Sequence, residues 1–368
     1  MITPRFLRHV LIKGLLLFAI INLVWAAFNP SLGKLSSYNM LFEGRDRLPF
    51  GEDSARSYNL SLYDLDAMFA SLKLDGPPKL DSEFRVFVIG DSSIWGTLLK
   101  PEETLAGKLD TAGLKTANGK EVRVYNLGYP TLSLTKDVMI LEYAMQYQPD
   151  LILWPVTLES FPRERQLLSP IVANNTQRVA KLFKAYDLDL TTPEDTSSFW
   201  DKTIIGQRRA LADLLRLQFY GVMWSATGVD QTYPSDYERA ARDLEADESF
   251  HDWVPPVIPE EGLAFDVIRA GIDIAGEVPL ILINEPMLVS TGENSDIRYN
   301  FYYPRWVYDQ YRQAFGENCA INAWICLDLW DVVPEDHFTN SAIHLDPQGE
   351  EMFLEKIIES GVFNPNLT

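Results

Sequence analysis

A serine follows directly after a run of residues that is typical of a buried strand in the stretch VFVIGDSSIWG, Val86–Gly96. In a parallel α/β sheet, ligands bind beyond the carboxyl ends of the strands. Ser92 could therefore act as a nucleophile, with backbone N–H groups nearby to bind an oxyanion. Taken alone, Gly-Asp-Ser is also a common tight turn, so the serine needs a base before it indicates chemistry.

The chain has only four histidines that could supply this base. His9 precedes an apolar segment near the N-terminus, and His251 lies in an acidic, aromatic loop. His337 and His344 lie between the last predicted strand and the last predicted helix, at the sheet edge where we also expect Ser92. We predict that His344 takes the hydroxyl proton of Ser92 and returns it to the leaving group. The alternative is that His344 caps or packs under the last helix.

Strand and helix patterns alternate around these residues. The predicted strands cover 84–90, 121–128, 149–156, 278–286 and 323–330. The predicted helices cover 100–113, 133–148, 262–276, 305–315 and 347–360. This order indicates an α/β domain with a parallel sheet and right-handed crossovers.

Four parts are expected along the chain. Residues 1–30 form a cytoplasmic tip and an anchor, 31–80 form a stalk, and 81–157 with 261–368 form the α/β domain. Residues 158–260 interrupt the alternation and are interpreted as a helical insertion that could act as a lid. Within it, we predict an apolar face on helix 208–224, a lid core at 219–224 and a charged helix at 236–247.

The N-terminus indicates a membrane anchor. Val10–Phe28 is apolar apart from Lys13 and Asn22, and as a helix it would span about 28 Å. Arg5 and Arg8 precede it, which places the N-terminus in the cytoplasm and the remaining chain outside, as a single-pass membrane protein. A cleaved signal peptide is the alternative, because Ala26 and Ala27 are small; a buried core helix is less consistent with this position.

Composition excludes several classes of function. The net charge of −20 argues against a nucleic-acid partner, because phosphates would repel the chain. Phosphate-loop, HExxH and EF-hand patterns are absent from the sequence. Cys319 and Cys326 lack the spacing of a zinc site, so no metal is expected. Outside the cytoplasm they could form a disulfide, and two free buried cysteines are the alternative.

Three stretches resemble the conserved blocks of the SGNH, or GDSL, hydrolase superfamily: VIGDSSIWG, VYNLGYP and AIHLDPQGEEMF. The resemblance implies a flavodoxin-like three-layer α/β/α sandwich. It also implies hydrolysis or transfer of O-acyl groups through an acyl-Ser92 intermediate, with no cofactor. The backbone N–H groups of Ser92 and Gly128 would form the oxyanion hole.

The chain departs from the family pattern at two places. Where the family has Gly-x-Asn-Asp, this sequence reads PVTL, so Thr157 takes the place of the oxyanion asparagine. The family's acid lies three residues before the histidine, and that place holds Ser341. Asn340 could orient the imidazole instead, as asparagine does in Cys–His–Asn sites, and Asp336 could do so if the loop folds back.

A polar, aromatic segment after the fourth predicted strand could recognise a sugar or a carboxylate. Its candidate substrate contacts are Asn284, Glu285, Arg298 and Tyr299. The alternative is an ordered surface loop with its own aromatic cluster.

These observations favour an extracytoplasmic serine esterase or O-acyltransferase that acts on acyl esters of a cell-envelope polysaccharide. An anchor followed by such a domain looks like the arrangement of alginate O-acetyltransferases and of proteins that D-alanylate teichoic acid. Transfer would need an acyl donor, delivered by a separate membrane protein. The second hypothesis is a catalytically silent relative that binds glycan or protein in a surface assembly.

Overall fold

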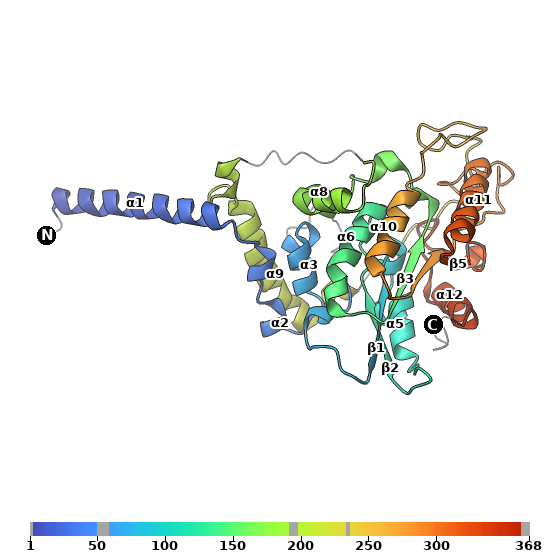
Figure 1. Cartoon of the computed structure of the whole chain (residues 1–368), viewed down its shortest axis with the longest axis horizontal. Coiled ribbons are helices and arrows are strands. Elements are labelled where there is room, and N and C mark those ends of the chain that lie inside the picture. The colour runs from blue at the N-terminus through green and yellow to red at the C-terminus, as the bar shows by residue number, and fades with distance from the viewer. Residues whose placement is uncertain (1–2, 50–58, 191–197, 233–235, 362–368) are drawn as a thin grey trace.

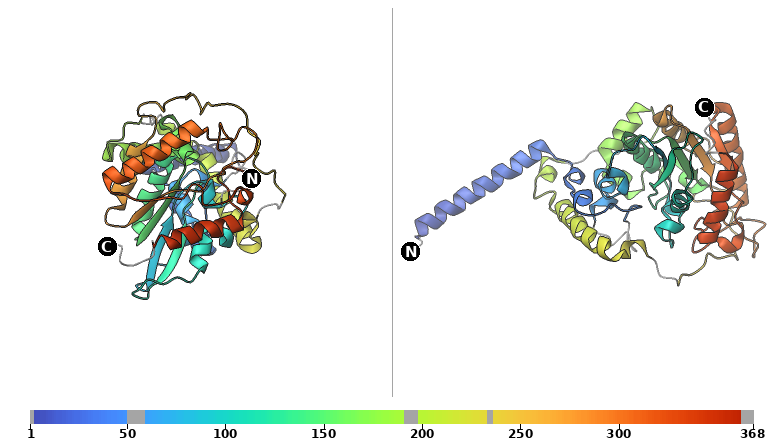
Figure 2. Two further views of the ribbon diagram at one scale, coloured as in Figure 1. Left: turned by 90° about the vertical axis from the view of Figure 1, so that its right-hand side faces the viewer. Right: turned by 90° about the horizontal axis from the view of Figure 1, so that it is seen from below.

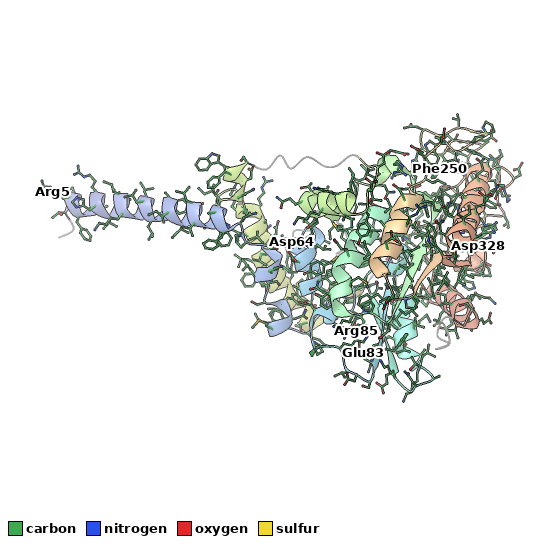
Figure 3. The ribbon with its side chains drawn as sticks, in the orientation of Figure 1. Arg5, Asp64, Glu83, Arg85, Phe250 and Asp328 are labelled. Carbon is green, nitrogen blue, oxygen red and sulfur yellow. A yellow bond between two sulfur atoms is a disulfide. The ribbon has the colours of Figure 1, made fainter. Side chains whose placement is uncertain are left out.

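The computed structural model describes residues 3–49, 59–190, 198–232 and 236–361. One long helix, α1 (Pro4–Phe28), projects from a globular α/β body, and Arg5 lies at its far end (Figures 1 and 3). By length and composition, α1 is able to cross a membrane.

A five-stranded sheet forms the centre of the body. Its strands are β1 (Glu83–Val88), β2 (Glu121–Asn126), β3 (Leu151–Val156), β4 (Leu280–Asn284) and β5 (Ile325–Asp328). They pair in the order β2-β1-β3-β4-β5, and every pair is parallel. This is the strand order of flavodoxin-like folds, so the predicted α/β class is confirmed.

Helices cover both faces of the sheet, because alternate residues of each strand point to opposite sides. Val86 and Val88 of β1 pack in one cluster with α5 (Leu105–Thr111) and α12 (Pro347–Glu359). Phe87 packs on the other side, in the cluster that contains α6 (Leu134–Ala144), α10 (Phe265–Ala275) and α11 (Arg305–Asn322). The result is the expected three-layer sandwich (Figure 2).

Part of the predicted stalk packs on this body. The segment contains α2 (Tyr38–Leu41), α3 (Leu65–Ala70) and short 3₁₀ helices at Gly33–Leu35, Leu60–Leu62 and Lys73–Asp75. Met68 and Phe69 of α3 are fully buried, and Phe69 stacks on Tyr143 of α6 at 4.4 Å between ring centroids. Residues 59–75 are therefore an integral layer beside α6.

The insertion is only partly as predicted. Helices α7 (Pro170–Asn174) and α8 (Thr176–Ala185) pack on α6. Helix α9 (Arg208–Thr227) forms at the predicted place, but Leu215 and Phe219 are exposed, so the predicted apolar face is only partly buried. Within 219–224, Gly221 and Trp224 are buried and Val222 and Met223 are exposed, so only part of this stretch is core. Residues 236–247 form no helix; they form an irregular segment, in which Ala240 N–H donates to Thr339 O at 2.8 Å.

Short helices and a disulfide complete the structure. Cys319 at the end of α11 is disulfide-bonded to Cys326 in β5. The remaining short elements are α4 (Ser92–Trp95) and 3₁₀ helices at Pro101–Glu103, Met145–Tyr147, Leu158–Ser160, Arg163–Arg165, Phe199–Lys202, Val229–Gln231 and Glu335–His337.

Candidate active site

Ser92 is the first residue of α4, directly beyond the carboxyl end of β1. The preceding Asp91 caps this helix, because its carboxylate accepts from Ser93 N–H at 2.8 Å. Gly96 ends the helix with a φ of +86°, a left-handed conformation that glycine adopts without steric cost. The strand, the cap and the glycine together fix Ser92 on a tight turn.

His344 and Asn340 complete a hydrogen-bonded chain with Ser92. The Nε2 atom of His344 lies 2.8 Å from Ser92 Oγ. Its Nδ1 atom lies 2.8 Å from Asn340 Oδ1. Because an amide oxygen only accepts, Nδ1 carries the proton and Nε2 accepts from the serine hydroxyl. The structure thus brings together three residues that the sequence singled out, in the tautomer that a general base needs.

Burial lowers the pKa of His344 from 6.5 to about 4. The imidazole is therefore neutral and able to take a proton across the physiological pH range. Asn340 fixes the ring but carries no charge, so it cannot neutralise the imidazolium that forms after proton transfer.

Neither Asp336 nor Ser341 takes the place of the acid. The Asp336 carboxylate is exposed and pairs with Arg242 at 2.6 Å, which lowers its pKa. Ser341 is buried, and its hydroxyl has no hydrogen-bond partner among the described residues. Of the two alternatives that the sequence left open for orienting His344, the geometry therefore fits Asn340, and the alternative of Asp336 is corrected.

Two of the three predicted oxyanion donors are engaged elsewhere. Gly128 N–H donates to Asn126 Oδ1 at 2.9 Å. The glycine is still required sterically, because a Cβ there would lie 2.4 Å from Trp95 N. Thr157 is fully buried, and its hydroxyl pairs with Tyr303 OH at 2.9 Å. The N–H of Ser92 has no acceptor among the described residues, which leaves it available to an oxyanion.

The four predicted substrate contacts are structural instead. Asn284 is fully buried and donates to Asp328 Oδ1 at 2.8 Å. Tyr299 donates to Asp309 Oδ1 at 2.8 Å. Arg298 is buried, and its guanidinium holds backbone carbonyls of two loops, among them Phe301 O at 3.0 Å and Tyr302 O at 3.1 Å. This segment is the ordered loop of the alternative interpretation.

Glu285, the fourth of these, lies beneath the nucleophile turn. Ser93 Oγ donates to Glu285 Oε2 at 2.5 Å, which ties α4 to the end of β4. Burial and the nearby Asp91 raise the pKa of Glu285 well above its usual value, which favours the protonated form of its carboxyl. Its other oxygen, Oε1, is buried without a partner among the described residues.

Two buried cations that sequence reasoning missed support the same turn. Lys136 on α6 donates to Gly90 O at 2.7 Å and pairs with Asp137 at 2.5 Å. Arg47, from the predicted stalk, donates to Trp95 O at 2.8 Å, Gly96 O at 2.7 Å and Leu99 O at 2.7 Å. The adjacent Lys136 and Asp137 within an apolar helical pattern could have indicated a buried ion pair from the sequence. No feature of the sequence indicated a role for Arg47.

Neither a protein-family model nor a curated protein sequence matches the chain. Among solved structures, it is similar to a member of the lipolytic G-D-S-L family from Veillonella parvula, with 10% identity over 75% of this chain and 96% of that chain, at a TM-score of 0.34.

Two further solved structures are similar to the same extent. The inhibitor-bound aryl esterase of M. smegmatis has 11% identity over 75% of this chain and 97% of that chain, with a TM-score of 0.35. A carbohydrate acetylesterase family member from Sinorhizobium meliloti has 14% identity over 76% and 96%, with a TM-score of 0.31. We draw no functional argument from likenesses this low.

Proposed function

We propose that this protein is a serine acyl esterase or O-acyltransferase. The observation that carries the proposal is the 2.8 Å contact between His344 Nε2 and Ser92 Oγ, with Asn340 holding the opposite ring nitrogen. A serine hydroxyl becomes an effective nucleophile when a neutral, correctly oriented imidazole accepts its proton.

The reaction would proceed in two halves. Ser92 Oγ attacks the acyl carbonyl while its proton moves to His344 Nε2, and Ser92 N–H faces the oxyanion. His344 then protonates the leaving alkoxide, which leaves an acyl ester on Ser92. Water for hydrolysis, or an acceptor hydroxyl for transfer, then attacks the acyl carbonyl while His344 takes its proton; the bond from the acyl carbon to Ser92 Oγ breaks, and His344 returns the proton to Ser92 Oγ.

We assign the acyl ester substrate to a cell-envelope polysaccharide on the basis of the chain's architecture. Helix α1 has the length of a membrane span, and Arg5 and Arg8 lie at the end that the positive-inside rule assigns to the cytoplasm. The Cys319–Cys326 disulfide supports an oxidising compartment for the body. In the transferase version, a membrane protein would deliver the acyl group.

Labelling with a fluorophosphonate probe tests the activated serine. The full chain in detergent, Ser92→Ala, His344→Ala and the control His337→Asn would be labelled and read by peptide mass spectrometry. His337 is the matched control because its ring contacts the Asp346 carboxylate rather than Ser92. We expect label on Ser92 in the wild type and the control, and none in the other two.

The competing function is a silent glycan- or protein-binding component. The engagement of Gly128 N–H and of the Thr157 hydroxyl favours it, since a working oxyanion hole normally offers two or three donors. Absence of label on a wild-type chain shown to be folded would decide for this second function.

A further inference from the structure

Helix α9 exposes a continuous apolar stripe. Leu215, Phe219, Val222 and Met223 follow the i, i+4, i+7, i+8 spacing of one helix face, and their exposed fractions lie between 44% and 72%. The opposite face is buried against the segment that follows α1, through Leu214, Leu217 and Trp224. An amphipathic helix normally turns its apolar side inward, whereas α9 is apolar on both sides.

The stripe belongs to the part of the body that adjoins α1. Trp25 Nε1 of α1 donates to Gln207 Oε1 at 2.8 Å, immediately before α9 begins. Ile205 N–H donates to Asn22 Oδ1 at 3.2 Å. From this junction, α9 runs steeply away from the axis of α1, along the edge of the body nearest to α1 (Figures 1 and 2).

These contacts also fix the position of residues 199–207 along the axis of α1. Asn22 lies six residues before the end of α1, which corresponds to about 9 Å along the helix axis. If α1 crosses a bilayer, the 199–207 segment lies beside the outer part of the span. Its outward side chains suit that environment: Phe199, Trp200 and Ile205 are exposed by 47%, 72% and 53%. Tryptophan is enriched at the membrane–water interface.

Residues 199–227 also differ from the rest of the chain in their net charge. The chain carries a net charge of −20, but residues 199–227 hold four basic residues against two acidic ones. The basic residues are Lys202, Arg208, Arg209 and Arg216. Basic residues beside an apolar stripe are typical of helices that lie on a membrane surface.

We propose that α9, together with residues 199–207, lies in the headgroup–acyl boundary of the bilayer that α1 crosses. The inference rests on the membrane anchoring in the proposed function but not on the chemistry at Ser92. A lipid surface fits better than a protein groove, because Trp25 and Asn22 of α1 contact Gln207 and Ile205 in the segment that leads into α9. The consequence is a body held against the membrane rather than extended from it on a stalk.

Spin labels at single cysteines test this placement. Both native cysteines are in the disulfide, so an introduced cysteine is the one free thiol among the described residues. The variants are Phe219→Cys on α9, Ile321→Cys on α11 as an aqueous control with 82% exposure, and Leu15→Cys on α1 as the anchor control. Each full-length chain is reconstituted in phosphatidylcholine–phosphatidylglycerol vesicles, and collision rates with oxygen and with a nickel chelate are measured.

We expect the ratio of the oxygen collision rate to the nickel-chelate collision rate to be severalfold higher at position 219 than at position 321. The ratio at position 15 should also exceed that at position 321. An aqueous ratio at 219 with a lipid ratio at 15 would overturn the inference and leave the anchor intact. Shielding of 219 from both reagents would assign the stripe to a protein partner and overturn it as well. An aqueous ratio at 15 would remove the anchor and this inference together, while Ser92 labelling would remain an independent result.

Discussion

His344 Nε2 reaches Ser92 Oγ across 252 positions of sequence because a short hairpin carries the histidine back over the sheet edge. Phe338 and Leu345 form an antiparallel bridge, and both are buried in the cluster that also contains Val88 at the end of β1. The neutral base is therefore held by packing of the hairpin on the sheet, and its Nδ1 atom contacts the Asn340 amide rather than a carboxylate.

Replacing Asn340 with aspartate is expected to raise the reactivity of Ser92. A carboxylate at this place would stabilise the imidazolium of His344. In serine proteases, exchanging the triad aspartate for asparagine costs about 10⁴-fold, a loss that arises from the wrong tautomer. Because Asn340 already fixes the productive tautomer, we expect a smaller gain, about 10- to 100-fold in the rate of fluorophosphonate labelling.

The pH dependence of that rate supplies the check. In the wild type, His344 is active when neutral, so the rate should fall only below about pH 4. A negative charge at position 340 raises the pKa of His344, so the acid limb of Asn340→Asp should lie at higher pH. Asn340→Ala is the control, and it should lower the plateau, which is the constant labelling rate reached above the acid limb. Identical plateaus in all three proteins would mean that residue 340 does not orient the ring.

Arg47 is expected to support the nucleophile turn from outside the sheet. Its guanidinium holds three buried carbonyls and stacks over the Trp95 ring at 4.3 Å. Arg47→Met should lower the free energy of unfolding by about 2–5 kcal/mol, because hydrogen bonds to a charged donor are lost in a buried site.

Urea unfolding and the labelling rate of Ser92 measure this effect together. Arg269→Met is the control, because Arg269 is exposed on α10, and its effect should stay within about 0.5 kcal/mol. If both variants unfold alike and label at the wild-type rate, the turn does not depend on Arg47.

The sheet and the reactive pair were predictable because their signals are local. Buried strands alternate with amphipathic helices, and parallel strands place their carboxyl ends at one edge. Ser92 and His344 each follow a predicted strand, so their meeting required only the strand order. The choice between Asn340 and Asp336 was not accessible in this way, because it depends on where Arg242 lies.

Arg242 lies beside Asp336 because tertiary contacts override the helical preference of residues 236–247. Residues 236–247 have the charge pattern of a helix but too few apolar residues to bury a face. Their backbone instead pairs with the loops around the site, at Thr339 O and, from Leu244 N–H, at Glu293 O. A dependence on distant contacts also applies to Arg298, whose partners include the carbonyl of Asp247, 51 positions away in the sequence.

Removing the disulfide should destabilise the body by a moderate amount. Cys319 and Cys326 are seven positions apart, and closing so short a loop lowers the entropy of the unfolded chain, which raises its free energy by about 2–3 kcal/mol. We expect the double replacement of both cysteines by serine to lower the free energy of unfolding by that amount under oxidising conditions. Under reducing conditions the two proteins should unfold alike; a difference that persists with reductant would contradict this origin.

Glu350 on α12 is expected to make stability depend on pH in the direction opposite to an ordinary salt bridge. It is buried, and desolvation raises its pKa from 4.5 to about 8 in the folded protein. Folding therefore favours the protonated carboxyl, and its contribution is fully retained below pH 4.5. As pH rises from 4.5 to 8, stability should fall by on the order of 5 kcal/mol in total and then level off.

Glu350→Gln mimics the protonated form without this loss, so its advantage over the wild type in urea unfolding should grow between pH 5 and pH 8. Glu355→Gln, exposed on the same helix, is the control and should track the wild type; parallel curves for all three proteins would show that Glu350 is already ionised when folded.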